Sequence, residues 1–494
     1  MSLPTNPRTA VPARPPRPLR SDIRLLGELL GQVLREQQGA DLFAGVEAVR
    51  RDCKALRQRF RPETAAALRQ RLDGLDLERV SAVARAFAIY FQLVNVAEQH
   101  HRIRRRRAHL LHPAAEGPQE DSFGEWLPRL RAQGVDPAAL RRLLGDLQVE
   151  LVSTAHPTEN VRRTVLEKYL AIHRALERRD QELTAAEAES LRLELLAEIT
   201  ALWQTDELRA SPPTVIDEVK NNLFYFDEIL FEAVPAVVEQ LEAAVAASWP
   251  DGPPQVGAVL RFGTWVGGDR DGNPSVTPAV TRHALLLAEQ LVLSKYLAAV
   301  AAVARKLSPT ATLQPCSEEL LESIRRDEAE MPDWRAFMEG RNLQEPYRRK
   351  LFFIYRRLGR TLAAVEAALA TGPEASAPAA DPGYGSAEAF AADLEVMARS
   401  LRGAGGQRLA AAHLDPLVRR VRLFGFHLAP LDMREHSARH AMACAELLRG
   451  RGLCPDYEAL PPAAQAEVLA AALAPGGWPE GPLPAGLSPE ARQV

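Results

Sequence analysis

The chain has 494 residues, 46 % of them hydrophobic and 25 % charged, with a formal net charge of −3. This size allows a substantial core, and the near-neutral charge argues against a dedicated nucleic-acid or membrane-surface protein. Four scattered cysteines without metal-like spacing indicate reduced thiols in a cytoplasmic protein, and no uncharged apolar run approaches the roughly 20 residues that span a bilayer.

The N-terminal region predicts a short tail followed by long helices. Residues 1–20 are rich in Pro and Arg and lack the features of a signal or transit peptide, so we expect a disordered tail. Helical periodicity starts at Asp22, with Ser21 as a candidate N-cap. A second helix, over residues 80–107, ends in the basic run 100–107. Cations are favourable near a helix C-terminus and no aromatic residues interleave them, so we expect no nucleic-acid partner.

Residues 149–158 place one histidine after a strand. The apolar run Val149–Val152 predicts a short strand, and the sequence continues Ser-Thr-Ala-His156-Pro157-Thr158. Pro157 restricts its own backbone and suits the first turn of a helix, so the backbone that carries His156 would be rigid. A lone histidine is more often a capping or buried structural residue, and its significance depends on two further segments of the same design.

The next segments are helical until a second strand. Residues 158–210 predict two helices broken near residues 182 and 183, with Thr184 and Glu187 forming a capping box. Residues 209–214 predict a rigid connector. The aromatic run 224–226 in the following helix is interpreted as core rather than as a cofactor contact.

A second strand over Val256–Val266 runs into the turn Trp265-Val266-Gly-Gly-Asp269-Arg270-Asp271-Gly-Asn-Pro274. Thr277 and Pro278 then give N-cap and first-turn signals for a helix over residues 281–306. Glycine, Asp and Asn cluster in any surface turn, and the segment lacks the residues of a phosphate loop or a dinucleotide fingerprint.

A third strand is predicted over Leu423–Leu431, followed by Asp432-Met433-Arg434. Three strands thus deliver charged groups at their C-terminal ends, where parallel α/β structures bind ligands. Between the second and third strands we expect a helix over residues 351–370 and a flexible insertion over residues 372–386.

These motifs resemble phosphoenolpyruvate carboxylase. The resemblance rests on Ser153–Thr158 with Arg162 and Arg163, on the Gly267–Pro274 turn and on Leu431–Arg434. Residues 19–37, 93–107 and 204–209 also resemble that family. The resemblance covers essentially the whole chain in the family's order, but only the N-terminal half of a family member.

The expected fold is mainly α, a helix-rich decoration around an incomplete (β/α)8 TIM-type barrel with about three of its strands in this chain. More than a hundred residues separate successive strands, whereas a plain barrel needs about 30 per unit. Three strands cannot close a barrel of eight. We therefore expect residues 21–494 to be the N-terminal half of one large domain. The helix start at Ser488-Pro489, with few residues after it, also suggests a truncated chain.

The resemblance implies carboxylation of phosphoenolpyruvate with bicarbonate to oxaloacetate and phosphate, an anaplerotic fixation of carbon dioxide. It assigns the general base to His156. Arg434 suits the contact to the phosphate because of its fixed fork of donors, with Asp432 orienting Arg434 or its neighbours. Trp265 and the following turn would exclude water from the intermediates. Asp269, Arg270 and Asp271 would belong to that wall or, alternatively, form a structural salt-bridged turn.

The resemblance further implies Mg²⁺, with ligands beyond Val494 and none in this chain, and a cytoplasmic homotetramer when full length. Arg162 and Arg163 are candidates for binding an anionic effector, with a solvated helix face or an inter-subunit ion pair as alternatives. We expect this chain to be inactive without the missing half. The alternatives are a non-catalytic helical regulatory or binding module of the same family, and an unrelated activity on the same fold.

Overall fold

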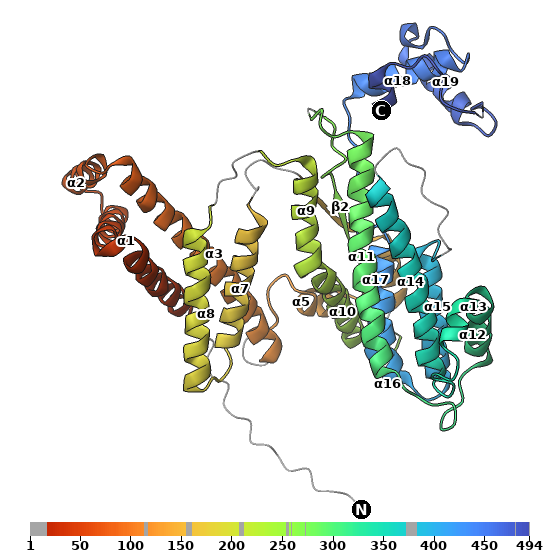
Figure 1. The fold of residues 1–494 in the computed structure, drawn as a ribbon, viewed down its shortest axis with the longest axis horizontal. Helices are drawn as coiled ribbons and strands as arrows, with labels where there is room; N and C mark the ends of the chain where they lie inside the picture. Colours follow the sequence, from red (N-terminus) through yellow and green to blue (C-terminus); the bar gives the residue numbers. More distant parts are fainter. Residues whose placement is uncertain are drawn as a thin grey trace, which may run out of the picture. The chain divides into compact units, whose positions relative to one another are not determined.

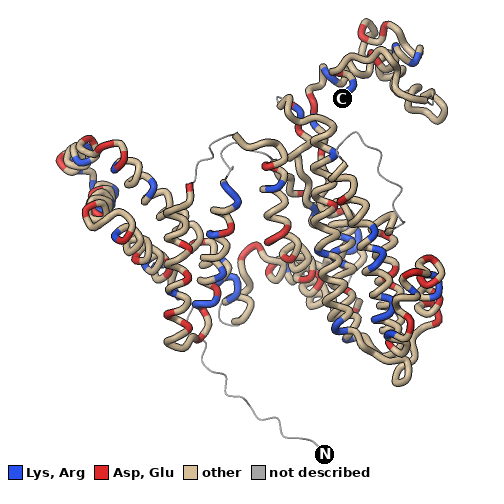
Figure 2. Tube along the Cα trace, in the orientation of Figure 1, with Lys and Arg blue, Asp and Glu red and all other residues tan. Residues whose placement is uncertain are grey.

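Two compact units make up the chain in the computed structural model (Figure 1), which describes residues 17–112, 117–154, 161–206, 212–252, 256–257, 259–271, 273–371, 383–479 and 481–493. Unit 1 comprises Met1–Ala132 and Val161–Pro212, and unit 2 comprises Gln133–Asn160 and Pro213–Val494. Lys and Arg are interspersed with Asp and Glu along the helices of both units (Figure 2), in keeping with the small net charge. The single domain expected over residues 21–494 stays a prediction.

The regular secondary structure among the described residues of unit 1 is all helical. Its helices are α1 (Leu19–Gln58), α2 (Pro62–Asp73), α3 (Leu77–Leu111), α5 (Phe123–Ala132), α7 (Arg163–Arg179) and α8 (Ala185–Gln204). The predicted capping box of Thr184 and Glu187 is confirmed. The predicted N-cap at Ser21 is wrong: α1 begins two residues earlier, and the Ser21 amide already donates to the Pro18 carbonyl at 2.9 Å.

The basic run at the end of α3 is not a helix terminus, because α3 continues to Leu111. Arg104 is buried and donates to the fully buried Asp22 and to Asp180, both at 2.8 Å. His100, also buried, bonds the same Asp180 oxygen at 2.9 Å. A buried charge needs such partners to offset its desolvation, so part of the run is a structural ion cluster inside unit 1.

Unit 2 is built around α11 (Pro278–Lys306) and α14 (Pro346–Thr371). Its remaining helical elements are α6 (Pro137–Asp146), α9 (Val215–Tyr225), η2 (Phe226–Leu230), α10 (Phe231–Ser248), α12 (Glu318–Glu330), α13 (Pro332–Phe337), α15 (Ala387–Gly403), α16 (Gln407–Leu409), η3 (Ala410–Leu414), α17 (Asp415–Phe424), α18 (Ser437–Gly450), η4 (Tyr457–Ala459), α19 (Pro462–Leu473) and α20 (Pro489–Gln493). Tyr296, Phe353 and Phe390 are fully buried in its core. The predicted start of α11 is confirmed, since Thr277 accepts from the Val280 amide.

The sheet of unit 2 has two parallel strands, β1 (Val149–Ser153) and β2 (Leu260–Thr264), paired in register from Val149 with Leu260 to Ser153 with Thr264. The mainly helical class and the first two strands are therefore confirmed. The described residues form no barrel, which stays a prediction.

The third predicted strand, Leu423–Leu431, is wrong. Its first two residues end α17, where Leu417, Val421 and Phe424 are buried at helical spacing. This amphipathic periodicity outweighs the apolar run that suggested a strand. Among the described residues, isolated parallel bridges join Thr264 to Leu431, at the end of the predicted strand, and Asp269 to Arg434 beyond it.

Residues 372–382 of the predicted flexible insertion lie outside the described residues. The rest of that insertion, residues 383–386, is anchored. The hydroxyl of the buried Tyr384 donates to Asp393 Oδ2 at 2.6 Å, and the Tyr384 amide donates to the Thr361 hydroxyl at 2.8 Å. Ser386 caps α15.

Two helices, α3 and α11, are long and apolar enough to cross a membrane by length and composition alone. Each one contributes to a core: α3 buries Ile89, Leu93 and Ala97 in unit 1, and α11 buries Leu293 and Val300 in unit 2. Length and composition do not distinguish a core helix from a membrane span. Because both helices bury apolar side chains inside their units, we interpret them as core helices.

We predict that acidification below about pH 6.5 destabilises unit 1 through His173. Burial, opposed by the neighbouring Glu177, lowers the pKa of His173 below its ordinary value of about 6.5. The unfolded chain therefore takes up the proton first, so this contribution is fully present above pH 6.5 and is lost as the pH falls through the lowered value. The thermal midpoint of a His173→Gln variant should fall less steeply between pH 7 and 5 than that of the parent. Parallel curves for the two proteins would contradict this assignment.

Candidate functional site

The candidate site begins where β1 and β2 end together. The Trp265 amide donates to the Ser153 carbonyl at 2.8 Å, which extends the strand pairing by one residue. A third element locks the two ends: Asn222 of α9 accepts from the Ser153 hydroxyl at 2.5 Å and donates to the Thr264 hydroxyl at 3.1 Å. The chain after each strand thus leaves from the same end of the sheet.

The turn after β2 is held by backbone contacts that only glycine permits. Gly267 has φ +92°, and its carbonyl accepts from the hydroxyl of Thr281 on α11 at 2.8 Å. A Cβ at Gly268 would lie 2.4 Å from the carbonyl oxygen of Asp432. The absence of side chains here lets the segment from residue 431 onward lie against the turn.

That second segment is bound to the turn in parallel register. The Thr264 amide donates to the Pro430 carbonyl, and the Asp432 amide donates to the Thr264 carbonyl, both at 2.9 Å. Further along, the Arg434 amide donates to the Gly268 carbonyl at 3.0 Å, and the Arg270 amide donates to the Arg434 carbonyl at 2.8 Å. Two segments far apart in sequence are therefore fixed side by side.

Four of the predicted site residues meet across this junction. The guanidinium carbon of Arg434 lies 3.8 Å from the ring centroid of Trp265, and its Nη1 donates to Asp269 Oδ2 at 3.0 Å. The Trp265 indole N–H donates to Asp432 Oδ2 at 3.1 Å. Asp432 therefore orients Trp265, while Asp269 is the carboxylate that holds Arg434. We name Trp265, Asp269, Asp432 and Arg434 the junction cluster.

The junction cluster is accessible to a ligand. The Arg434 side chain is 40 % exposed and that of Asp269 is 33 % exposed. Ion pairs at such exposure stabilise a fold by about 1 kcal/mol or less. Arg434 donates to one carboxylate through Nη1, and no further bond of its guanidinium is found in the described part of the chain. The remaining donors of its planar fork suit an oxyanion.

Arg270 and Asp271 lie beside the junction cluster but differ from each other. Arg270 is buried, whereas Asp271 is exposed and its amide donates to Asp269 Oδ1 at 3.3 Å. Burial raises the pKa of Glu435, but the His436 amide and the charges of Arg439 and Arg270 outweigh it and hold that pKa below its ordinary value. Arg270 is buried and its charge helps to keep Glu435 ionised, which favours a structural role for Arg270.

Three predicted site residues remain, namely His156, Arg162 and Arg163. His156 lies outside the described residues. Arg162 and Arg163 belong to unit 1, where Arg162 donates to the Asp206 carbonyl at 2.6 Å and Arg163 pairs with Glu167 at 2.9 Å. An effector role for these two arginines stays a prediction.

Sequence reasoning assigned no role to Asn222 or Glu435. Asn222 lies on α9 next to the aromatic run that we interpreted as core, so only the pairing of strand ends reveals its function. Glu435 could have been noticed from its spacing to Arg439, an i to i+4 ion pair that the structure shows at 3.2 Å.

The described residues offer no donor set for Mg²⁺. No group of three or more His, Cys, Asp or Glu side chains converges in the part of the chain that the structure describes. Asp269 is engaged with Arg434, and Asp432 with Trp265.

Comparison with known proteins identifies relatives over nearly the whole chain. The family model described as "Phosphoenolpyruvate carboxylase" matches residues 19–476. The phosphoenolpyruvate carboxylase of Roseiflexus castenholzii is 38 % identical over 457 residues, which cover 91 % of this chain and 48 % of that protein. Those of Nocardia farcinica and Ralstonia nicotianae are also 38 % identical, over 95 % and 90 % of this chain and 49 % and 44 % of their own lengths. The chain spans about half the length of these relatives.

Gly268→Ala should destabilise unit 2 by about 1–3 kcal/mol, because the added Cβ would overlap the Asp432 carbonyl and force the two segments apart. Gly403→Ala is the matched control: it lies at the exposed end of α15 with no atom within 4 Å of the added Cβ, so its stability should stay within about 0.5 kcal/mol of the parent. Denaturant unfolding followed by circular dichroism measures both. Equal stability of the two variants would show that the close approach is not required.

Proposed function

This chain belongs to the phosphoenolpyruvate carboxylase family, and we propose that, together with the remaining half of the family's length, it carboxylates phosphoenolpyruvate with bicarbonate to give oxaloacetate and phosphate. It would act as a carbon–carbon lyase in a cytoplasmic homotetramer. The observation that carries the proposal is the junction cluster at the ends of paired parallel strands, within a chain that matches its relatives over 90–95 % of its length. Mg²⁺ would be held by the other half and would stabilise the negative charge of the enolate.

Arg434 is proposed to bind the phosphate group of phosphoenolpyruvate. Trp265 covers one face of the guanidinium and Asp269 holds one of its nitrogens, so the fork is oriented before substrate arrives. Its other N–H groups can donate to phosphate oxygens in the paired geometry that a planar guanidinium allows. Preorganised donors of this kind stabilise charge without reorganising during the reaction.

His156 is proposed as the general base that takes the proton of carboxyphosphate. Ser153, three residues before it, is the register partner of Thr264 and accepts from the Trp265 amide. The chain therefore leaves β1 toward His156 at the end of the sheet where Trp265 begins the turn. An imidazole has a pKa close to neutrality, which suits proton transfer under cellular conditions.

The turn from Gly267 to Asn273 is proposed to keep water from the reacting groups. Carboxyphosphate and the enolate both react with water, so carboxylation requires that they be enclosed. Trp265, two residues before this turn, is held by Asp432, which gives the proposed wall a fixed aromatic face.

The exposed edge of β1 supports the proposal that further barrel strands come from the other half. Val149, Leu151 and Val152 are 46 %, 51 % and 39 % exposed, and no strand other than β2 pairs with β1 among the described residues. Parallel sheets are normally covered on both faces. Additional strands pairing with β1 would bury these side chains and complete a barrel.

A hybrid protein tests whether the missing half confers activity. We predict no oxaloacetate formation by residues 1–494 alone with phosphoenolpyruvate, bicarbonate and Mg²⁺. Residues 1–476 joined to the part of the Roseiflexus castenholzii carboxylase beyond its matched segment should form oxaloacetate, measured by coupled oxidation of NADH. Activity of the chain alone would overturn the need for the other half. A folded but inactive hybrid would favour the alternative of a non-catalytic module.

In that hybrid, His156→Asn and Arg434→Lys should fail differently. Loss of the base should reduce oxaloacetate formation about 10²–10⁴-fold and raise the ratio of pyruvate to oxaloacetate, because carboxyphosphate hydrolyses instead of delivering carbon dioxide. Arg434→Lys keeps the charge but loses the fork, so kcat/KM should fall roughly tenfold or more with an unchanged product ratio. Near-normal oxaloacetate output from His156→Asn would remove His156 from the mechanism. The same product ratio in both variants would mean that the two roles are wrongly divided.

A further inference from the structure

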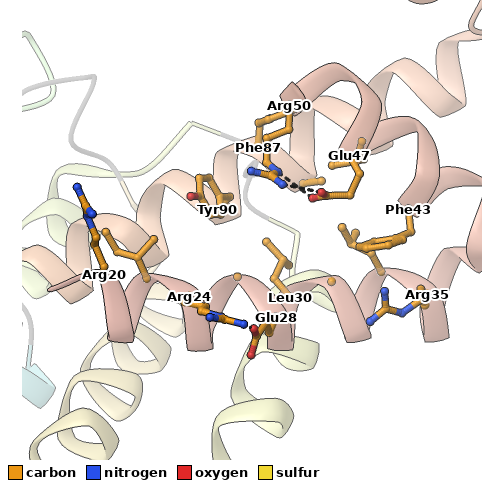
Figure 3. Close-up of a pocket in the computed structure, with 16 residues that line it drawn as sticks. Arg20, Arg24, Glu28, Leu30, Arg35, Phe43, Glu47, Arg50, Phe87 and Tyr90 are labelled. Carbon is orange, nitrogen blue, oxygen red and sulfur yellow. Dashed lines mark hydrogen bonds and ion pairs between the residues drawn. The ribbon is translucent and has the colours of Figure 1, made fainter. Parts of the chain in front are cut away.

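Unit 1 contains a cavity of about 450 Å³, whereas the junction cluster belongs to unit 2. Helix α1 breaks at Gly39 (φ +86°), and its second part returns beside the first. The cavity lies in this bend and is closed on a third side by α3 (Figure 3). Its size is within the range of small-molecule sites.

The walls of the cavity are apolar and partly aromatic. They are formed by Ile23, Leu30, Leu34, Phe43, Val46, Ala86, Phe87 and Tyr90. Phe43 and Tyr90 lie toward opposite ends of the space in Figure 3. Flat rings facing an apolar surface suit a planar ligand, which would stack on one ring and present its edge to another.

Two glycines on α1, one turn apart, line the floor of the cavity. A Cβ at Gly31 would lie 2.9 Å from the Phe43 ring, so packing of that ring explains this glycine. A Cβ at Gly27 would make only ordinary contact with Tyr90, at 3.6 Å, and the backbone there is helical. Alanine would fit at Gly27 and would favour the helix. The effect of Gly27 is therefore the space that it leaves open.

The rim of the cavity is positively charged. Arg50 donates to Glu47 through two nitrogens at 2.9 and 2.7 Å, and this hydrogen bonding lowers the pKa of Glu47, which stays ionised. Arg24 pairs with Glu28 at 2.8 Å. Each of these pairs is neutral, so the positive charge of the rim comes from two further arginines.

The two remaining cations are Arg35 and Arg20. Arg35 lies over the Phe43 ring, with its guanidinium carbon 4.2 Å from the centroid. Arg20 makes no hydrogen bond or ion pair within the described ranges of the chain. In Figure 3 the hydroxyl end of Tyr90 lies on the side of Arg20. A cation and a hydroxyl at one end of an apolar slot can both donate to a carboxylate.

We propose that this cavity binds a planar aromatic carboxylate, with its ring over Gly27 between Phe43 and Tyr90 and its anionic group at Arg20. The proposal goes beyond the carboxylase reaction and does not depend on it. Charge selects the anion because the rim has two more arginines than acidic residues, and the rings select the flat apolar body. Binding joins the two parts of α1 to α3 and should therefore stabilise unit 1.

Titration with 2-naphthoate, followed by its fluorescence polarisation, tests the proposal, with the uncharged 2-naphthamide as its isosteric counterpart. Arg20→Gln should weaken naphthoate binding by up to about fivefold, the effect of one exposed charge pair, and leave naphthamide unchanged. Arg69→Gln, an exposed arginine of α2 outside the cavity, is the matched control and should change neither.

Gly27→Leu should abolish binding of both probes, since its side chain fills the floor. Gly27→Ala should reduce binding less while raising the thermal midpoint, which separates loss of space from loss of folding. Equal affinity for naphthoate and naphthamide, or naphthoate binding unaffected by Gly27→Leu and Gly27→Ala, would overturn the proposal. So would a change of oligomeric state in the cavity variants without any naphthoate binding to the parent, because a second copy of the chain would then occupy the cavity.

Discussion

The parallel hydrogen bonding at the ends of β1 and β2 is the constraint on which the candidate site depends. It continues past the strands through the Trp265 amide to Ser153 and through the Asp432 amide to Thr264. Each bond fixes the register of the next segment, since a slip of one residue would turn every side chain to the opposite face. Without this register, Trp265 and Arg434 could not stack, and the carboxylates on either side would have no defined partners.

The energetics of the junction cluster favour function over stability. The ion pair of Arg434 and Asp269 is partly exposed, so it contributes little to the fold. Gly267 and Gly268 raise the conformational entropy that the chain loses on folding, and they contribute no side chain to packing. A side chain at Gly268 would nevertheless collide with the neighbouring backbone. The local sequence thus provides close backbone approach and an oriented guanidinium, which are properties of a binding site.

In unit 1, by contrast, charged side chains are buried and stabilise the fold. Asp22 is fully buried between Arg104 and Arg179, at 2.8 and 2.5 Å. Removing one partner of such a group would leave an uncompensated buried charge, at a cost of about 3–5 kcal/mol. The same residue types that remain exposed at the junction cluster therefore hold the helices of unit 1 together, and burial distinguishes the two roles.

The sequence alone determined the features that depend on neighbours along the chain. The strands around residues 149 and 260, the capping box at Thr184 and the start of α11 at Thr277 follow from short patterns, because caps and strand runs are local interactions. The motifs at residues 153, 267 and 431 also indicated the family. The helical periodicity of residues 415–424 is likewise a local pattern, whereas only the tertiary structure decided that residues 425–430 form turns instead of a strand. It also decided that Asp269, rather than Asp432, holds Arg434 from 165 residues away, because a contact over that distance is set by strand register and not by local sequence.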